Sequence, residues 1–124
     1  MSTPAQSGEQ GIALERFYQF VLWLIPTVDK FPRSQKFLLG DRVQQTSLTV
    51  LELLIEATYT RERRSLLLRA NLALEKLRVL MRLAKDLRHL DERRYEFASR
   101  SLLEVGRLIG GWLKIAAAPA GTSG

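Results

Sequence analysis

The chain has 124 residues, 46% of them hydrophobic, and a formal net charge of +6 at pH 7, which suits a single domain with its own core. It contains no cysteine, so disulfides, zinc–thiolate sites and thiol nucleophiles are excluded; this suits a reducing cytoplasm, where we expect the protein to act. The first residues show no basic and apolar leader, and the apolar run 20–25 is far shorter than the ~20 residues that span a bilayer, so we expect no membrane anchor.

Positive charge is concentrated in the second half of the chain. Residues 1–60 contain 5 Lys and Arg against 6 acids, whereas residues 61–124 contain 14 Lys and Arg against 7 acids. A localised positive field attracts polyanions, such as nucleic acid, an anionic membrane surface or an acidic protein.

The first two helices are predicted on either side of a proline corner. Residues 1–11 are expected to form a disordered leader. A helix from Ile12 to about Lys30 follows, with apolar residues at positions 14, 17, 21, 24 and 28 and a kink at Pro26. Pro32 favours a turn, so the next helix begins within a residue or two and ends near Thr58. Gly40 weakens this helix unless a neighbouring helix approaches closely there.

Two longer helices are predicted to follow, hinged at residues 90–92. Thr60 is expected to cap the third helix, with Glu62 in its first turn, and Asp91 to cap the fourth, which ends near Ala116. The core seam expected on the third helix is Leu66, Ala70, Ala73, Leu77, Leu80, Ala84 and Leu87, with Leu67, Leu74 and Met81 beside it. The apolar stripe of the fourth is Tyr95, Ala98, Leu102, Val105, Ile109 and Trp112.

Residues 12–116 therefore predict an all-α, antiparallel, up-down-up-down four-helix bundle, followed by a disordered tail at 117–124. Some apolar residues fall outside the main seams: Trp23, Leu48, Ile55, Leu74, Met81, Leu108 and Trp112. Because this exceeds what one bundle core needs, we expect the chain to self-associate as a homo-oligomer.

No residue pattern predicts catalysis, a metal or a cofactor. A di-metal bundle needs several Glu and His ligands, and the chain has one histidine, His89, near the polar end of a helix. Glu52 and Glu56 lie four residues apart on an apolar stretch and could raise each other's pKa as an acid–base pair. A structural role is favoured, in which they meet arginines of a neighbouring helix or subunit.

Basic residues are predicted to form rows on the last two helices, and they are the candidate binding site for nucleic acid or a protein partner. The set comprises Arg69, Arg78, Arg82, Lys85, Arg88, Arg93, Arg100, Arg107 and Lys114. The last four recur every seventh residue, over roughly 32 Å at 1.5 Å per residue. Glu96 and Glu104 have the spacing to pair with Arg100 and Arg107, and no nearby acid was expected to balance Arg78 and Arg82. Such rows contact phosphates and do not read sequence.

Several segments resemble the accessory variability determinant proteins of diversity-generating retroelements. They are Phe31-Pro32-Arg33-Ser34-Gln35-Lys36-Phe37 with Leu39, Gly40 and Arg42, then Leu51–Ala57, Leu72–Ala84 and Gly106–Lys114, and the match covers roughly residues 14–115. These are helix-packing segments rather than catalytic motifs. The related ribosomal-RNA intervening-sequence proteins share the Phe-Pro corner but usually carry an Asn-Ile-Ala-Glu-Gly-like segment where this chain has Leu54–Ala57, which favours the retroelement branch.

The resemblance implies a four-helix bundle that assembles as a barrel-like homopentamer with a basic surface. It also implies a non-enzymatic subunit that binds reverse transcriptase and its RNA or cDNA during mutagenic reverse transcription. Two other functions stay open: a structural scaffold of the intervening-sequence type whose arginines pair between subunits, and an RNA-processing enzyme that uses Glu52 and Glu56 in an accessible cleft.

Overall fold

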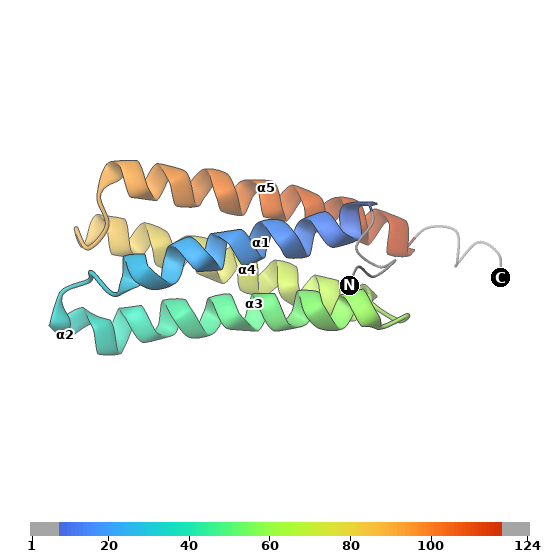
Figure 1. The fold of residues 1–124 in the computed structure, drawn as a ribbon, viewed down its shortest axis with the longest axis horizontal. Helices are drawn as coiled ribbons and strands as arrows, with labels where there is room; N and C mark the ends of the chain where they lie inside the picture. Colours follow the sequence, from blue (N-terminus) through green and yellow to red (C-terminus); the bar gives the residue numbers. More distant parts are fainter. Residues whose placement is uncertain (1–7, 118–124) are drawn as a thin grey trace.

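Four long helical segments lie side by side with alternating direction in the computed structural model, which describes residues 8–117 (Figure 1). The elements are α1 (Gly8–Val28), α2 (Arg33–Gln35), the π-helical turn η2 (Lys36–Gly40), α3 (Asp41–Tyr59), α4 (Arg64–Asp86) and α5 (Glu92–Ala117). Helix α1 packs against α3 and α5, and α4 packs against the same two helices. The predicted all-α four-helix bundle is confirmed.

The helical region extends slightly beyond the predicted boundaries. Helix α1 begins at Gly8, so the last residues of the predicted leader are helical, and α5 continues to Ala117. Residues 1–7 and 118–124, the remainder of the predicted leader and tail, lie outside the described residues. Among the helices of residues 8–117, none has both the length and the apolar content needed to cross a membrane.

The corner after α1 is closed by Pro32 and continued by a π-helical turn. The carbonyl of Pro32 accepts hydrogen bonds from the N–H groups of Gln35 (2.8 Å) and Lys36 (3.0 Å), and α2, η2 and α3 then follow without a break. A Cβ atom at Gly40 would lie 2.9 Å from Val28 Cγ1. The predicted close approach of another helix at Gly40 is therefore confirmed, and the neighbour is α1.

Helix α4 begins later than predicted, and its core side combines part of the predicted seam with the row beside it. Thr60 has an extended backbone and ends α3, and α4 begins at Arg64 with no side-chain cap hydrogen bond, so the predicted Thr60 cap is wrong. The buried side chains of α4 are Leu67, Ala70, Ala73, Leu74, Leu77, Met81 and Ala84. Leu66 and Leu80 of the predicted seam are only partly buried, and Leu87 is exposed. Leu67, Leu74 and Met81, the row expected beside the seam, pack more deeply than these three residues.

The corner between α4 and α5 agrees with the prediction. The Asp91 Oδ1 atom accepts a hydrogen bond from the backbone N–H of Arg94 at 2.8 Å, which is the bond expected of an N-cap residue. Arg88 has a φ of 68°, a left-handed conformation that lets the chain leave α4 and turn back toward α5.

Much of the apolar surplus is used inside the bundle. Leu74, Met81 and Trp112 are buried in the core, and Trp23 packs against it with its ring centroid 4.7 Å from that of Phe97. These residues therefore give no support to self-association. Leu48 and Ile55 do remain exposed.

Exposed apolar side chains nevertheless gather on two parts of the surface. The first, here called the apolar face, lies along α1 and α3 and contains Tyr18, Leu22, Ile25, Leu48, Ile55 and Tyr59. The second, the α4 ridge, contains Leu68, Leu72, Val79 and Leu83. Each ridge residue lies nine positions from a buried residue of the same helix, about two and a half turns, so the ridge points away from the core.

The position of the apolar face follows from the contacts that α1 and α3 make on their other sides. Arg16 and Trp23 of α1 contact α5, so Tyr18 and Ile25, each two residues further on, lie more than half a turn away, toward α3. Thr46 of α3 lines a groove shared with α4, and Ile55, nine residues later, lies on the opposite side, toward α1.

Candidate nucleic-acid interface

A row of four cations runs along the outer side of α5 and is here called the basic row. It contains Arg93, Arg100, Arg107 and Lys114, all exposed. The side of α5 that faces the core contains Ala98, Leu102, Val105, Ile109 and Trp112, all buried. Seven-residue spacing keeps the row on one line, because seven residues are almost two helical turns. The cationic row predicted for the fourth helix is present as a continuous surface feature.

The two acids with the spacing to pair with Arg100 and Arg107 do not pair with them. The carboxylate of Glu104 pairs with Arg16 of α1, and Glu96 has no ion-pair partner among the side chains that the structure describes. Within the same described side chains, no carboxylate lies within ion-pair distance of the basic row. Local spacing could not show this, because Arg16 reaches Glu104 from a helix distant in sequence.

The cations of α4 are partly matched by acids, contrary to expectation. Arg78 lies 3.6 Å from Glu75, and Arg82 and Lys85 lie 3.9 Å and 3.7 Å from Asp86. Exposed pairs of this kind are worth about 0–1 kcal/mol and weaken with salt. A phosphate group that approaches Arg78 or Arg82 therefore competes with a weak partner.

Arg78, Arg82 and Lys85 lie on the side of α4 that faces α5. Arg78 and Arg100 line a shallow groove of about 630 Å³ between the two helices, together with Tyr95, Ser99, Leu103 and two acids, Glu92 and Glu96. Arg82 lines an adjoining hollow that shares Arg78, Tyr95 and Ser99. The groove thus sets guanidinium groups and two hydroxyls beside the basic row, and each is a hydrogen-bond donor for phosphate oxygens.

Two of the predicted site residues lie apart from this groove. Arg69 is nine residues before Arg78, so it lies on the opposite side of α4. Arg88 follows the end of α4 and lines a separate pocket at the corner with α5. The sequence pattern assigned Tyr95 to the apolar stripe and gave Ser99 no role, although their i, i+4 spacing beside Arg100 was a usable signal for the groove.

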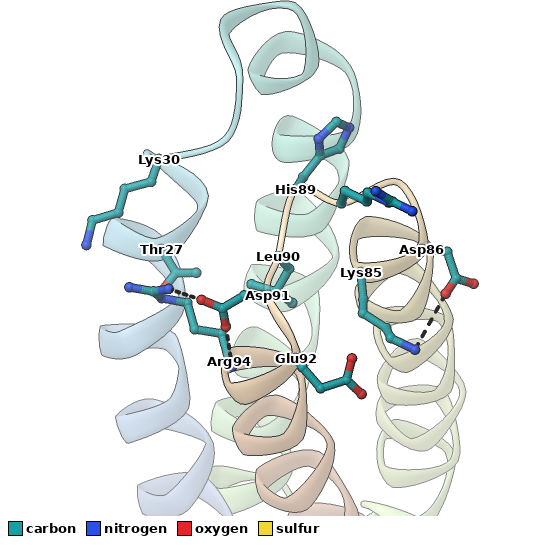
Figure 2. Close-up of a pocket in the computed structure, with 10 residues that line it drawn as sticks. Thr27, Lys30, Lys85, Asp86, His89, Leu90, Asp91, Glu92 and Arg94 are labelled. Carbon is teal, nitrogen blue, oxygen red and sulfur yellow. Dashed lines mark hydrogen bonds and ion pairs between the residues drawn. The ribbon is translucent and has the colours of Figure 1, made fainter.

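The corner pocket, of about 660 Å³, gathers charged side chains from α4, from α5, from the corner between them and from the turn that follows α1 (Figure 2). Each of its aspartates is paired with a neighbouring cation: Asp91 with Arg94, and Asp86 with Lys85. The backbone N–H of Arg94, which donates to the Asp91 carboxylate, lowers the pKa of that carboxyl below its ordinary value of 3.8. In Figure 2, Lys30 points away from the side chains of the α4–α5 corner, so the pocket does not bring its cations together around one ligand.

No catalytic arrangement is evident in the corner pocket. His89 approaches Phe31, with 5.9 Å between the ring centroids, and no hydrogen bond joins it to a serine or a carboxylate among the described side chains. Nor do residues 8–117 contain a group of three or more His, Cys, Asp or Glu that could hold a metal ion. The corner is a structural junction, and the groove and the basic row form the candidate interface.

Comparison with known families agrees with the four-helix fold. The bAvd-like family, the bacterial accessory variability determinants, matches residues 12–116. The chain belongs to the bAvd-like family. No curated protein matches it.

In this bAvd-like chain, Glu52 and Glu56 are exposed on α3. Neither carboxylate forms an ion pair with another described side chain, so the predicted pairing with an arginine of a neighbouring helix is wrong within one subunit. Neither residue lines the groove, the hollow that adjoins it or the corner pocket, so none of these sites supports an acid–base pair in a cleft.

Proposed function

We propose that this bAvd-like chain is a non-enzymatic accessory subunit of a diversity-generating retroelement. In this role it binds the element's reverse transcriptase together with template RNA or cDNA and supports mutagenic reverse transcription. Family membership supports the accessory role, and the lack of cysteine suits action in the cytoplasm. The observation that carries nucleic-acid binding is the basic row, whose four exposed cations have no carboxylate partner among the described side chains.

The spacing of the row suits a phosphate backbone. Its cations are separated by about 10 Å along α5, at 1.5 Å per residue, so successive side chains meet different phosphates. The guanidinium groups of Arg78, Arg82 and Arg100 lie beside the row and widen the contact. Contacts of this kind fix the position of a nucleic acid and add affinity without reading its bases.

We also propose that the subunit works as a homo-oligomer, a pentamer in line with the family resemblance. The apolar face and the α4 ridge are different surfaces, so a contact between them is heterologous and closes into a ring when the rotation allows. Their flanking charges are complementary. Glu52 and Glu56 lie beside the apolar face, and Arg69 and Lys76 lie beside the α4 ridge, which gives Arg69 a role outside the phosphate groove.

The test is binding of labelled template RNA and of purified reverse transcriptase by the wild type and by an Arg100→Glu/Arg107→Glu variant. An Arg42→Glu/Arg61→Glu variant is the matched control for RNA binding, because it makes the same charge change at exposed positions away from the groove and the basic row. We expect all three proteins to keep the same helical circular dichroism spectrum, and only the α5 variant to lose most of its affinity for RNA.

Unchanged RNA affinity in the α5 variant would reject the assignment of the basic row. A wild-type protein that binds neither RNA nor reverse transcriptase would overturn the proposed function and favour the scaffold alternative.

A further inference from the structure

The most exposed large apolar side chains of the described region are adjacent in sequence and lie at one end of the bundle. Phe37 is 76% exposed and Leu38 is 71% exposed. Both belong to the π-helical turn η2, at the end of the bundle where α1 meets α2 (Figure 1). Here the two residues together are called the apolar tip. Single exposed apolar residues are ordinary, but a paired aromatic and aliphatic projection is the kind of feature that marks a contact site.

The backbone that carries the apolar tip is held firmly. On one side, Phe31 is buried and its ring approaches that of His89. On the other, Leu39 is buried and Gly40 packs against Val28. π-helical turns are rare and occur frequently at functional sites. Because folding has already ordered this backbone, the tip loses little further conformational freedom when it binds.

The charges around the apolar tip are mainly positive. Lys30, Arg33 and Arg42 are exposed, while Lys36 lies 3.7 Å from Asp29. An apolar centre with a charged rim is the usual anatomy of a protein–protein contact. The complementary surface is an apolar pocket with an acidic rim. A nucleobase would stack on Phe37 alone, since Leu38 has no π-face, so the pair fits a protein better than a nucleic acid.

The apolar tip is separate from the other surfaces of the molecule. The apolar face and the α4 ridge lie along the sides of the bundle, so subunits that pack side by side through them leave the bundle ends uncovered. The basic row also runs along a side, on α5.

We propose that the apolar tip is the docking site for the protein partner, distinct from the surface that binds nucleic acid. The inference rests on the proposed function, in which that partner is the reverse transcriptase. It predicts that reverse transcriptase presents an apolar pocket with an acidic rim, and that the two binding activities can be removed independently.

The experiment measures binding of purified, nuclease-treated reverse transcriptase of the same retroelement to immobilised full-length chain. We expect Phe37→Ser/Leu38→Ser to weaken this binding at least about tenfold, the loss typical of an interface anchor, while affinity for template RNA stays at the wild-type value. Ile115→Ser, which also removes an exposed apolar side chain but from the far part of α5, is expected to change neither affinity. Phe37→Leu/Leu38→Met keeps the tip apolar and should keep most of the binding, which separates loss of the contact from loss of the fold.

Wild-type affinity for reverse transcriptase in Phe37→Ser/Leu38→Ser would overturn this inference and leave the proposed function standing. Loss of RNA binding instead would show that the tip contacts nucleic acid, and a change of oligomer mass would show that it contacts another copy of the chain; either result overturns the inference. If the wild type itself does not bind reverse transcriptase, the partner named in the proposed function is wrong, and the inference fails with it.

Discussion

Replacing Arg100 and Arg107 with glutamine removes half of the basic row without adding a negative charge. Both side chains are exposed, and neither has an ion-pair partner among the described side chains. Glutamine favours a helix about as well as arginine does. We therefore expect the variant to fold normally and to change only the electrostatic part of binding.

The expected magnitude follows from the number of phosphate contacts. For single-stranded nucleic acid, each contact contributes about −0.7 to the slope of log K against log salt concentration. Four contacts along the row give a slope contribution of about −2.8, so affinity falls roughly 50-fold between 50 and 200 mM salt. With two contacts the contribution is about −1.4, and the fall is roughly sevenfold.

Fluorescence anisotropy with labelled template RNA across a salt series measures both slopes. Arg42→Gln/Arg61→Gln is the control, since it makes the same charge change away from α5, and it should retain the wild-type slope. Equal slopes for the wild type and Arg100→Gln/Arg107→Gln would refute the reasoning, because affinity would then not depend on phosphate contacts made by the row.

Three further predictions concern the stability and assembly of the bundle. Gly40→Ala should lower the free energy of unfolding by roughly 1 kcal/mol in urea titrations, because overpacking against Val28 costs about 1–3 kcal/mol, more than the about 1 kcal/mol by which alanine favours a helix over glycine. At Gly110 an added Cβ meets nothing within 4 Å, so Gly110→Ala should raise the free energy of unfolding by up to about 1 kcal/mol. Asp91→Ala should lower the urea midpoint at pH 7. Because the pKa of Asp91 is lowered in the folded state, its carboxylate stabilises the fold fully at pH values above the unfolded-state pKa near 3.8. This stabilisation is lost as the pH falls through the lower folded-state pKa. The difference in urea midpoint between the variant and the wild type should therefore shrink below about pH 4. Leu72→Glu/Val79→Glu on the α4 ridge should reduce the oligomer to monomer in light scattering, because burying the new carboxylates is costly.

Each of these predictions has a contradictory outcome. Equal stability changes for the two glycine variants would show that the contact with Val28 relaxes freely. An Asp91→Ala difference that persists unchanged at pH 3 would show that the cap does not act through its charge. For assembly, Gln19→Glu/Asn71→Glu adds the same charge to exposed polar positions outside the apolar face and the α4 ridge and should leave the mass unchanged; an unaltered mass in the ridge variant as well would remove the ridge from the interface.

Local signals in the sequence were sufficient where the structure is locally determined. The Asp91 cap depends on a hydrogen bond to the backbone three residues later, and the proline corner depends on the restricted backbone of Pro32. Thr60 was misplaced because the same residue type ends one helix as readily as it begins another. Its extended backbone is set by the chain that leaves α3.

Features that depend on packing were not predictable in the same way. Leu66 and Leu67 are neighbours of the same residue type, and both lie near the core side, so periodicity alone could not decide which is buried more deeply. The pairing of Glu104 with Arg16 depends on α1 lying beside α5. Likewise, the π-helical turn that exposes Phe37 was not predicted, because Gly40 marked only a weak point of the helix.

Because α1 begins and α5 ends at the same end of the bundle (Figure 1), a short linker from Ala117 to Gly8 can join the two helices into a circularly permuted chain. New termini placed between Thr60 and Arg63, in the connection before α4, would keep all four long helices intact. The opening also lies at the end of the bundle opposite Phe37 and Leu38. A purification tag or fluorescent protein attached there would therefore leave the region around those two side chains unobstructed.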